Sequence, residues 1–246
     1  DYKKIKHKNS SGISFKFKII SQIIIALIAV IIFQKFSNYQ ELTNLYFPFL
    51  KNLVINLGWF FVPFSVFIIV GSSNAVNLTD GLDGLAILPC ILIASAFVIF
   101  AYVHGNINIS EYLLIPYIEG SGEIAIFAAS LVGAGLGFLW FNSYPAEIFM
   151  GDCGSLSLGS SLGLLAIILK QELAFAIMSG IFIAEVLSVI IQVTSFKMRN
   201  GKRVFKMAPL HHHYELSGLS EPKIIMRFWI ITFILVLIAL STLKIR

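Results

Sequence analysis

Seven long apolar stretches constrain this chain more than any other feature of its sequence. Each is close to the roughly 20 mostly apolar residues that a helix needs to cross the hydrocarbon core of a membrane. The fifth is short, so it either tilts or continues into the loop before it. The stretches are residues 17–36, 53–71, 85–103, 124–141, 156–170, 173–195 and 225–243.

The composition supports a membrane protein. Hydrophobic residues make up 57% of the chain and charged residues 13%, whereas soluble domains carry about 25% charged residues. Cys90 and Cys153 have neither metal-type spacing nor a disulfide pattern. We therefore expect an all-α fold, a polytopic helical bundle with seven spans, which forms a single domain over residues 1–246.

Loop charge orients this bundle. With the N-terminal end in the cytoplasm, 13 of the 18 Lys and Arg residues fall in cytoplasmic segments. The positive-inside rule selects this orientation and accounts for the net charge of +5, so nucleic acid is not expected as a partner. Asp1, the loop at 80–83, the Asp152 loop and the histidines at 211–213 then share one membrane face and can form a single site.

Asn74, Asn77, Asp80 and Asp83 recur at every third residue. On a helix this spacing drifts by about 60° per step, so we expect the four side chains to cover roughly half of one helix end. Helix capping can explain one or two of them but not all four. Because carboxylates near lipid are costly unless they are needed, we interpret the run as part of a binding site.

Asp152 follows Gly151 in a turn, after Pro145 has ended the preceding helix. A single carboxylate, completed by water and substrate phosphates, is typical of a Mg²⁺ site, and the alternative is that Asp152 caps the next helix. This turn should expose Phe149, which either stacks on a planar base or packs into lipid.

His211, His212 and His213 are consecutive. Neighbouring helical residues do not share a face, so three ligands for one metal require an irregular loop, which Pro209 allows. Zinc has little support because no Cys or carboxylate stands at zinc spacing, and phosphate binding by the imidazoles is the alternative. Gln192, late in the sixth stretch, either pairs with another helix or faces the site.

The runs at 74–84, 145–158 and 207–215 resemble the cytoplasmic loops of the phospho-N-acetylmuramoyl-pentapeptide-transferase family, within glycosyltransferase family 4. The opening Asp1-Tyr2-Lys3-Lys4 is similar to the family's Asp-Asp-Tyr-x-Lys motif without its first Asp. Family members have ten spans, so the resemblance implies that three helices and one acid precede Asp1.

The resemblance also implies a reaction. UDP-N-acetylmuramoyl-pentapeptide gives its phospho-sugar-peptide to undecaprenyl phosphate at the bacterial inner membrane, forming lipid I and UMP for peptidoglycan synthesis in a step that uses Mg²⁺. By similarity, Asp152 holds Mg²⁺, Asp1 orients or deprotonates the lipid phosphate, and His211 assists catalysis. The implied substrate-binding residues are Lys4, Lys16, Asn74, Asn77, Asp80, Asp83, Asn142, Phe149, Gln192, His212 and His213.

Two rival functions stay open at this point. A sister polyprenyl-phosphate transferase that uses UDP-N-acetylglucosamine shares the Asp-rich loops but differs in the histidine loop, so the run at 211–215 favours the muramoyl-peptide branch. A secondary transporter would place acids near the bilayer midplane, whereas these acids lie at helix ends on one side. The sequence sets no oligomeric state, and a homodimer is compatible with it.

Overall fold

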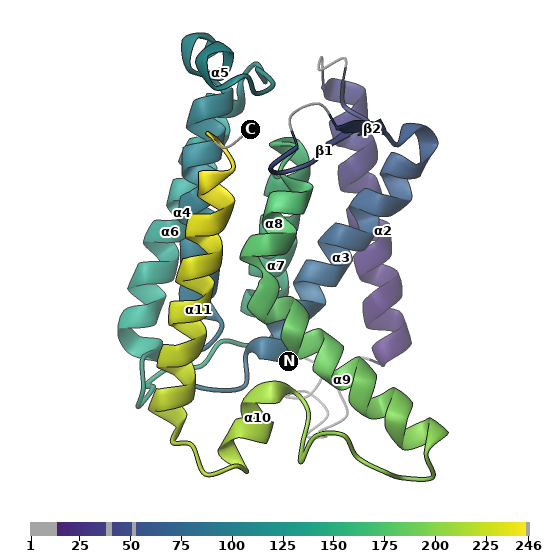
Figure 1. Cartoon of the computed structure of the whole chain (residues 1–246), viewed down its shortest axis with the longest axis vertical. Coiled ribbons are helices and arrows are strands. Elements are labelled where there is room, and N and C mark those ends of the chain that lie inside the picture. The colour runs from purple at the N-terminus through teal and green to yellow at the C-terminus, as the bar shows by residue number, and fades with distance from the viewer. Residues whose placement is uncertain (1–13, 38–40, 51–52, 245–246) are drawn as a thin grey trace, which may run out of the picture.

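The computed structural model describes residues 14–37, 41–50 and 53–244. Its long helices run between two ends of the molecule (Figure 1). They are α2 (Phe15–Phe36), α3 (Phe61–Thr79), α4 (Ile87–His104), α6 (Ser121–Asn142), α7 (Asp152–Ile168), α9 (Gly180–Met198) and α11 (Glu221–Ser241). The short helices are η1 (Gly58–Phe60), α5 (Ile107–Leu113), α8 (Glu172–Met178) and α10 (Leu210–Glu215). Strands β1 (Asn44–Tyr46) and β2 (Val54–Asn56) form an antiparallel hairpin.

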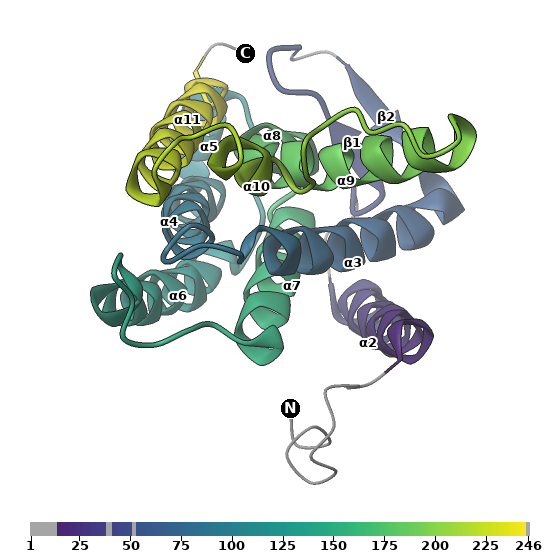
Figure 2. The same ribbon diagram turned by 90° about the horizontal axis from the view of Figure 1, so that it is seen from below.

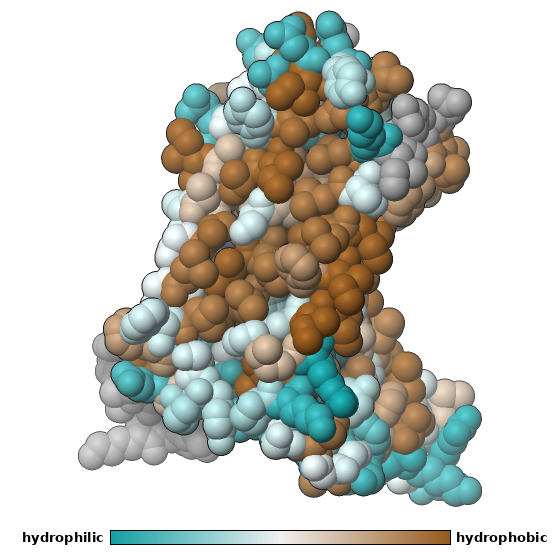
Figure 3. All heavy atoms as spheres, turned by 60° about the vertical axis from the view of Figure 1, so that its left-hand side comes forward, coloured by the Kyte–Doolittle hydropathy of each residue, from teal (hydrophilic) through white to brown (hydrophobic). Residues whose placement is uncertain are grey.

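The expected polytopic helical bundle is confirmed. In the described part of the chain, six helices are long and apolar enough to cross a membrane, namely α2, α3 together with η1, α4, α6, α9 and α11. α7 is apolar but slightly shorter, with 17 residues. Apolar side chains form a broad band between two polar ends (Figure 3), as a lipid-embedded surface requires.

Two of the predicted spans differ most from the helices of the structure. The predicted span 53–71 begins as strand β2, and its helix starts only at Phe61, after Gly58 has turned the chain with a φ of +52°. The predicted span 173–195 is divided into α8 and α9 at Ser179. α9 then leaves the direction of the bundle and runs to the lower right of Figure 1.

α3 packs closely against α7, and α4 against α6 (Figure 2). A Cβ added at Gly159 would lie 2.5 Å from the carbonyl oxygen of Ser72, so only glycine permits this distance between α3 and α7. The hydroxyl of Ser72 donates to the Gly159 carbonyl at 2.8 Å, and that of Ser73 donates to the Leu156 carbonyl at 2.9 Å. These bonds fix the start of α7 beside the end of α3.

Candidate active site

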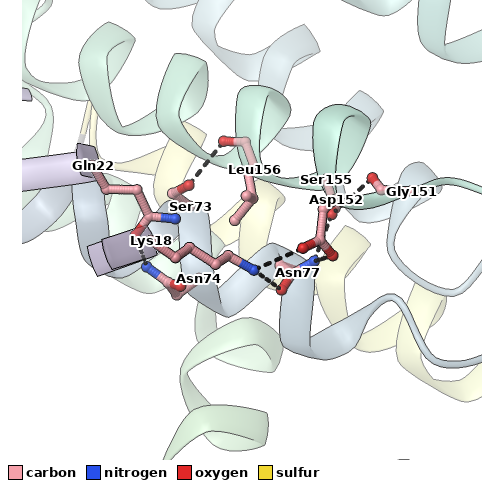
Figure 4. Close-up of polar contacts among 9 residues, drawn as sticks. All are labelled: Lys18, Gln22, Ser73, Asn74, Asn77, Gly151, Asp152, Ser155 and Leu156. Carbon is pink, nitrogen blue, oxygen red and sulfur yellow. Dashed lines mark hydrogen bonds and ion pairs between the residues drawn. The ribbon is translucent and has the colours of Figure 1, made fainter. Parts of the chain in front are cut away.

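Asp152 is the first residue of α7, and Gly151 before it is the N-cap. A carboxylate in the first turn is favoured by the positive end of the helix dipole. Its Oδ2 lies 3.0 Å from Nζ of Lys18 on α2, and its Oδ1 accepts a hydrogen bond from Nδ2 of Asn77 on α3 at 3.1 Å (Figure 4). The Asp152 side chain is still 56% exposed, so a ligand can reach it.

Asn77 joins the three helices. Its Oδ1 accepts from Lys18 at 3.2 Å, and its Nδ2 also donates to Oγ of Ser155 at 2.8 Å. The orientation of the amide follows from these partners, because an ammonium only donates and a carboxylate only accepts. Lys18, Asn77, Asp152 and Ser155 form one connected group, the Asp152 network, with residues from α2, α3 and α7.

Asn74 lies one helical turn before Asn77 and ties α2 to α3. Its Nδ2 donates to Oε1 of Gln22 at 2.7 Å and to the Val70 carbonyl at 2.8 Å (Figure 4). These bonds place the amide of Asn74 between α2 and α3, about one turn of α3 further from the end of that helix than Asn77.

Asp80 and Asp83 lie beyond α3, so the predicted arrangement of four side chains on one helix end is wrong. The helix ends at Thr79, Asp80 is its C-cap, and Asp83 belongs to the turn that follows. Asp83 reaches the loop between α6 and α7, where its Oδ2 accepts the N–H of Ala146 at 2.9 Å. A turn, and not helical periodicity, therefore sets the directions of the two acids.

Burial and, to a smaller extent, the negative charge of Asp152 raise the pKa of Asp80 to about 6. A cation beside these two carboxylates would offset both effects. Mg²⁺ suits such a site, because it is commonly bound by one or two carboxylates and keeps waters and substrate phosphates as its other ligands. Within residues 14–37, 41–50 and 53–244, no three His, Cys, Asp or Glu side chains form a metal cage by themselves.

Asn142 holds two loops of the site together. Its buried Oδ1 accepts the N–H of Gly84 at 3.1 Å, and its Nδ2 donates to the Ile148 carbonyl at 2.8 Å. Phe149, next along this loop, is 74% exposed, as the turn predicted.

The histidine run forms the short helix α10, and its rings contact different partners. Nδ1 of the buried His211 lies 3.3 Å from Oε1 of Glu185, whereas Nδ1 of His212 lies 2.6 Å from Oε2 of Glu215. Nδ1 of His213 accepts a backbone N–H at 3.2 Å. The irregular loop that a three-histidine zinc site needs is not formed, so the structure does not support zinc here.

Gln192 bonds to the backbone of the loop that leads to α10. Its Oε1 accepts the N–H groups of Val204 and Phe205, both at 3.0 Å, and its Nε2 donates to the Phe205 carbonyl at 3.0 Å. This is a third arrangement beside the two that the sequence left open. Of the remaining predicted residues, Lys16 is exposed on α2, and Asp1 and Lys4 lie outside the described residues.

Sequence reasoning missed Lys18 and Glu185. Lys18 lies about 200° around α2 from Lys16, and its Nζ contacts Asn77 and Asp152. The apolar pattern of α2 does not distinguish the two lysines, because the buried Ala26 is about equally far from both around the helix. Glu185 stands alone in an apolar stretch, and an acid in such a place is a functional candidate by default.

Together these features define a polytopic α-helical membrane protein with a group of acidic, amide and lysine side chains at one end of its bundle. Residues 9–170 match the model of glycosyl transferase family 4. The chain is 64% identical over all its 246 residues to a phospho-N-acetylmuramoyl-pentapeptide-transferase of Pelagibacter ubique (strain HTCC1062), and it covers 68% of that relative. The chain therefore belongs to glycosyl transferase family 4, which confirms the resemblance seen in its loops.

Proposed function

We propose that the chain transfers phospho-N-acetylmuramoyl-pentapeptide from UDP-N-acetylmuramoyl-pentapeptide to undecaprenyl phosphate, with UMP and lipid I as products. The observation that carries the proposal is the Asp152 network at a bundle end, in a chain 64% identical to a relative named for this transfer. One substrate is a soluble nucleotide and the other is a lipid phosphate. A site that is open to solvent at the end of membrane helices can receive both.

Asp152 would hold Mg²⁺ against the diphosphate, with Asp80 adding a second negative charge nearby. The bound ion would supply charge neutralisation and polarise the phosphate oxygens. Phosphoryl transfer asks the protein mainly for positioning and for further positive charge. Lys18 would provide that charge beside Asp152, whereas Lys16 is the lysine of this helix that the resemblance implied as a substrate-binding residue.

The other residues divide between the two substrates. The exposed ring of Phe149 can stack on uracil, and the turn with Asp83 lines the nucleotide side.

His211, His212 and His213 lie on the short helix α10 at the same end of the bundle, where imidazoles can donate to phosphate oxygens. Asn74, Asn142 and Gln192 would support the site by joining the helices and loops around it through their hydrogen bonds. Asp1 and Lys4 would act on the lipid phosphate.

This end of the bundle faces the cytoplasm of a bacterial inner membrane in our proposal. Basic residues cluster in the segment that connects α9 to α10, close to α10 and at the same end as the start of α7 (Figure 1). The positive-inside rule assigns such a segment to the cytoplasmic side. The nucleotide substrate is a cytosolic solute, so this side also gives it direct access.

Asp152→Asn tests the proposal in the full-length gene product, with whatever precedes Asp1 included. We expect UMP release with both substrates and Mg²⁺ to fall by about 10²–10³-fold, the loss typical of one electrostatic group at a transition state. Glu147→Gln, an exposed acid in the same loop, is the control and should retain activity. Wild-type turnover of UDP-N-acetylglucosamine instead would favour the sister transferase, and transport without any UMP release would reject the enzyme class.

A further inference from the structure

Glu185 is a carboxylate on α9 that the proposed chemistry does not use. It is fully buried, with 0% of its surface exposed, and a charge in such surroundings is costly unless it is compensated. Its two oxygens face α10. Oε2 accepts the N–H of Leu210 at 2.7 Å, and Oε1 accepts the N–H of His211 at 3.2 Å.

These bonds cap α10 from another helix. Leu210 and His211 are its first two residues, whose N–H groups have no partner within a helix. Pro209 occupies the N-cap position and makes no side-chain cap bond. Glu185 therefore supplies the cap that the local sequence lacks and joins α9 to α10.

The same carboxylate lies beside the ring of His211, whose buried Nδ1 makes no hydrogen bond within the described residues. Nδ1 of His211 lies 3.3 Å from Oε1 of Glu185, and both side chains are at most 1% exposed. On the opposite side of the ring, Nε2 abuts Gly81, where an added Cβ would overlap it. Because Gly81 directly follows Asp80, Nε2 faces the turn that carries one of the site acids.

We propose that Glu185 is a positioning residue for the transfer reaction, which fixes α10 and directs Nε2 of His211 toward the turn of Asp80 and Gly81. The proposal rests on the proposed function, in which that turn lines the diphosphate site. An amide cannot replace the carboxylate, because its NH₂ group would face a backbone N–H that also donates.

A double-mutant cycle on UMP release tests this role. We expect Glu185→Gln to lower kcat about 10- to 100-fold, as loss of an outer-shell partner commonly does, with a change in KM for the UDP substrate of less than about threefold. In a His211→Asn background the same substitution should cause little further loss, because Glu185 acts through that ring. Losses that multiply in the double variant would overturn the proposal.

Glu172→Gln is the matched control. Glu172 is a second buried carboxylate, at the start of α8, and it pairs with Lys170 at 2.8 Å. Its loss should lower the unfolding temperature but leave kcat per folded molecule unchanged. A kcat loss equal to that of Glu185→Gln would mean that destabilisation alone explains both results, which would overturn the proposal.

A second readout separates this proposal from the proposed function. If Glu185→Gln does not fold, Glu185→Asp keeps both acceptor oxygens and takes its place in the cycle, with the same coupling to His211 expected. A cycle on thermal unfolding measures the coupling without turnover. Suppose that the two residues are coupled in stability but the wild-type protein releases no UMP. The proposed function would then be rejected, and with it the kinetic role of Glu185. The contact between Glu185 and α10 would still be supported.

Discussion

At the scale of single residues, the charge of Asp152 is balanced by donors from two other helices. Lys18→Met removes an ammonium that lies 3.0 Å from Asp152 and 3.2 Å from Asn77. We expect kcat/KM for UMP release to fall about 10- to 100-fold, because hydrogen bonds to charged groups contribute roughly 1.5–3 kcal/mol. Lys16→Met, on an exposed face two residues away, should change it less than about threefold. Equal losses in the two variants would contradict the Asp152 network.

Asp80 predicts a dependence of stability on pH. Its pKa of about 6 lies above the ordinary 3.8, so the folded state binds more protons than the unfolded state between these values, and the free energy of unfolding falls as pH rises through that window. Without Mg²⁺, Asp80→Asn should be more stable than wild type by about 1 kcal/mol at pH 7.5, after allowance for solvent screening. The difference should shrink toward pH 4 in thermal unfolding, and a difference that is constant with pH would argue against it.

The residue types and the spacing of the loops selected Asp152 and Asn77 as site candidates, because acids beside lipid are rarely without function, and the structure brings the two side chains into contact. The choice between Lys16 and Lys18 could not be made from sequence. The choice depends on which face of α2 packs against α3, and the contacts with α3 determine that face. The helical placement of Asp80 and Asp83 failed because the three-residue spacing suits a helix and also a turn that contains glycine.

At the scale of elements, the contact between α3 and α7 places the Asp152 network. A Cβ at Gly159 would lie 2.5 Å from the Ser72 carbonyl oxygen and 2.7 Å from Cα of Ser73, so Gly159→Ala must push the two helices apart. We expect a loss of about 1–3 kcal/mol in stability, as overpacking typically costs, and a lower rate of UMP release per folded molecule. Gly137→Ala is the control, because a Cβ there meets no atom within 4 Å. Thermal unfolding that is the same for both variants would contradict the packing argument.

Hydropathy predicted that spanning helices exist and roughly where most of them lie, because lipid demands long apolar segments. It could not predict that α3 continues to Thr79, since the serines near its end are stabilised by bonds to the backbone of α7. α10 was equally hidden from the sequence. Its first N–H groups are capped by Glu185, a residue 25 positions before Leu210.

At the scale of the whole molecule, the Asp152 end of the bundle should face the cytoplasm. Cys153, beside Asp152, is exposed, whereas Cys90 is buried. A membrane-impermeant maleimide should therefore label Cys153 in inside-out vesicles but not in intact spheroplasts. The label should disappear in Cys153→Ser. Labelling from the outer side would reverse the orientation.

The central claim is that residues from α2, α3 and α7 hold one metal-bound diphosphate. Mn²⁺ in place of Mg²⁺ allows the claim to be tested by electron paramagnetic resonance on the protein with UDP-N-acetylmuramoyl-pentapeptide. We expect phosphorus hyperfine coupling at the bound ion in the wild type and in Glu147→Gln, and loss of that signal in Asp152→Asn. An Asp152→Asn variant that binds Mn²⁺ and substrate with unchanged affinity and unchanged coupling would contradict it.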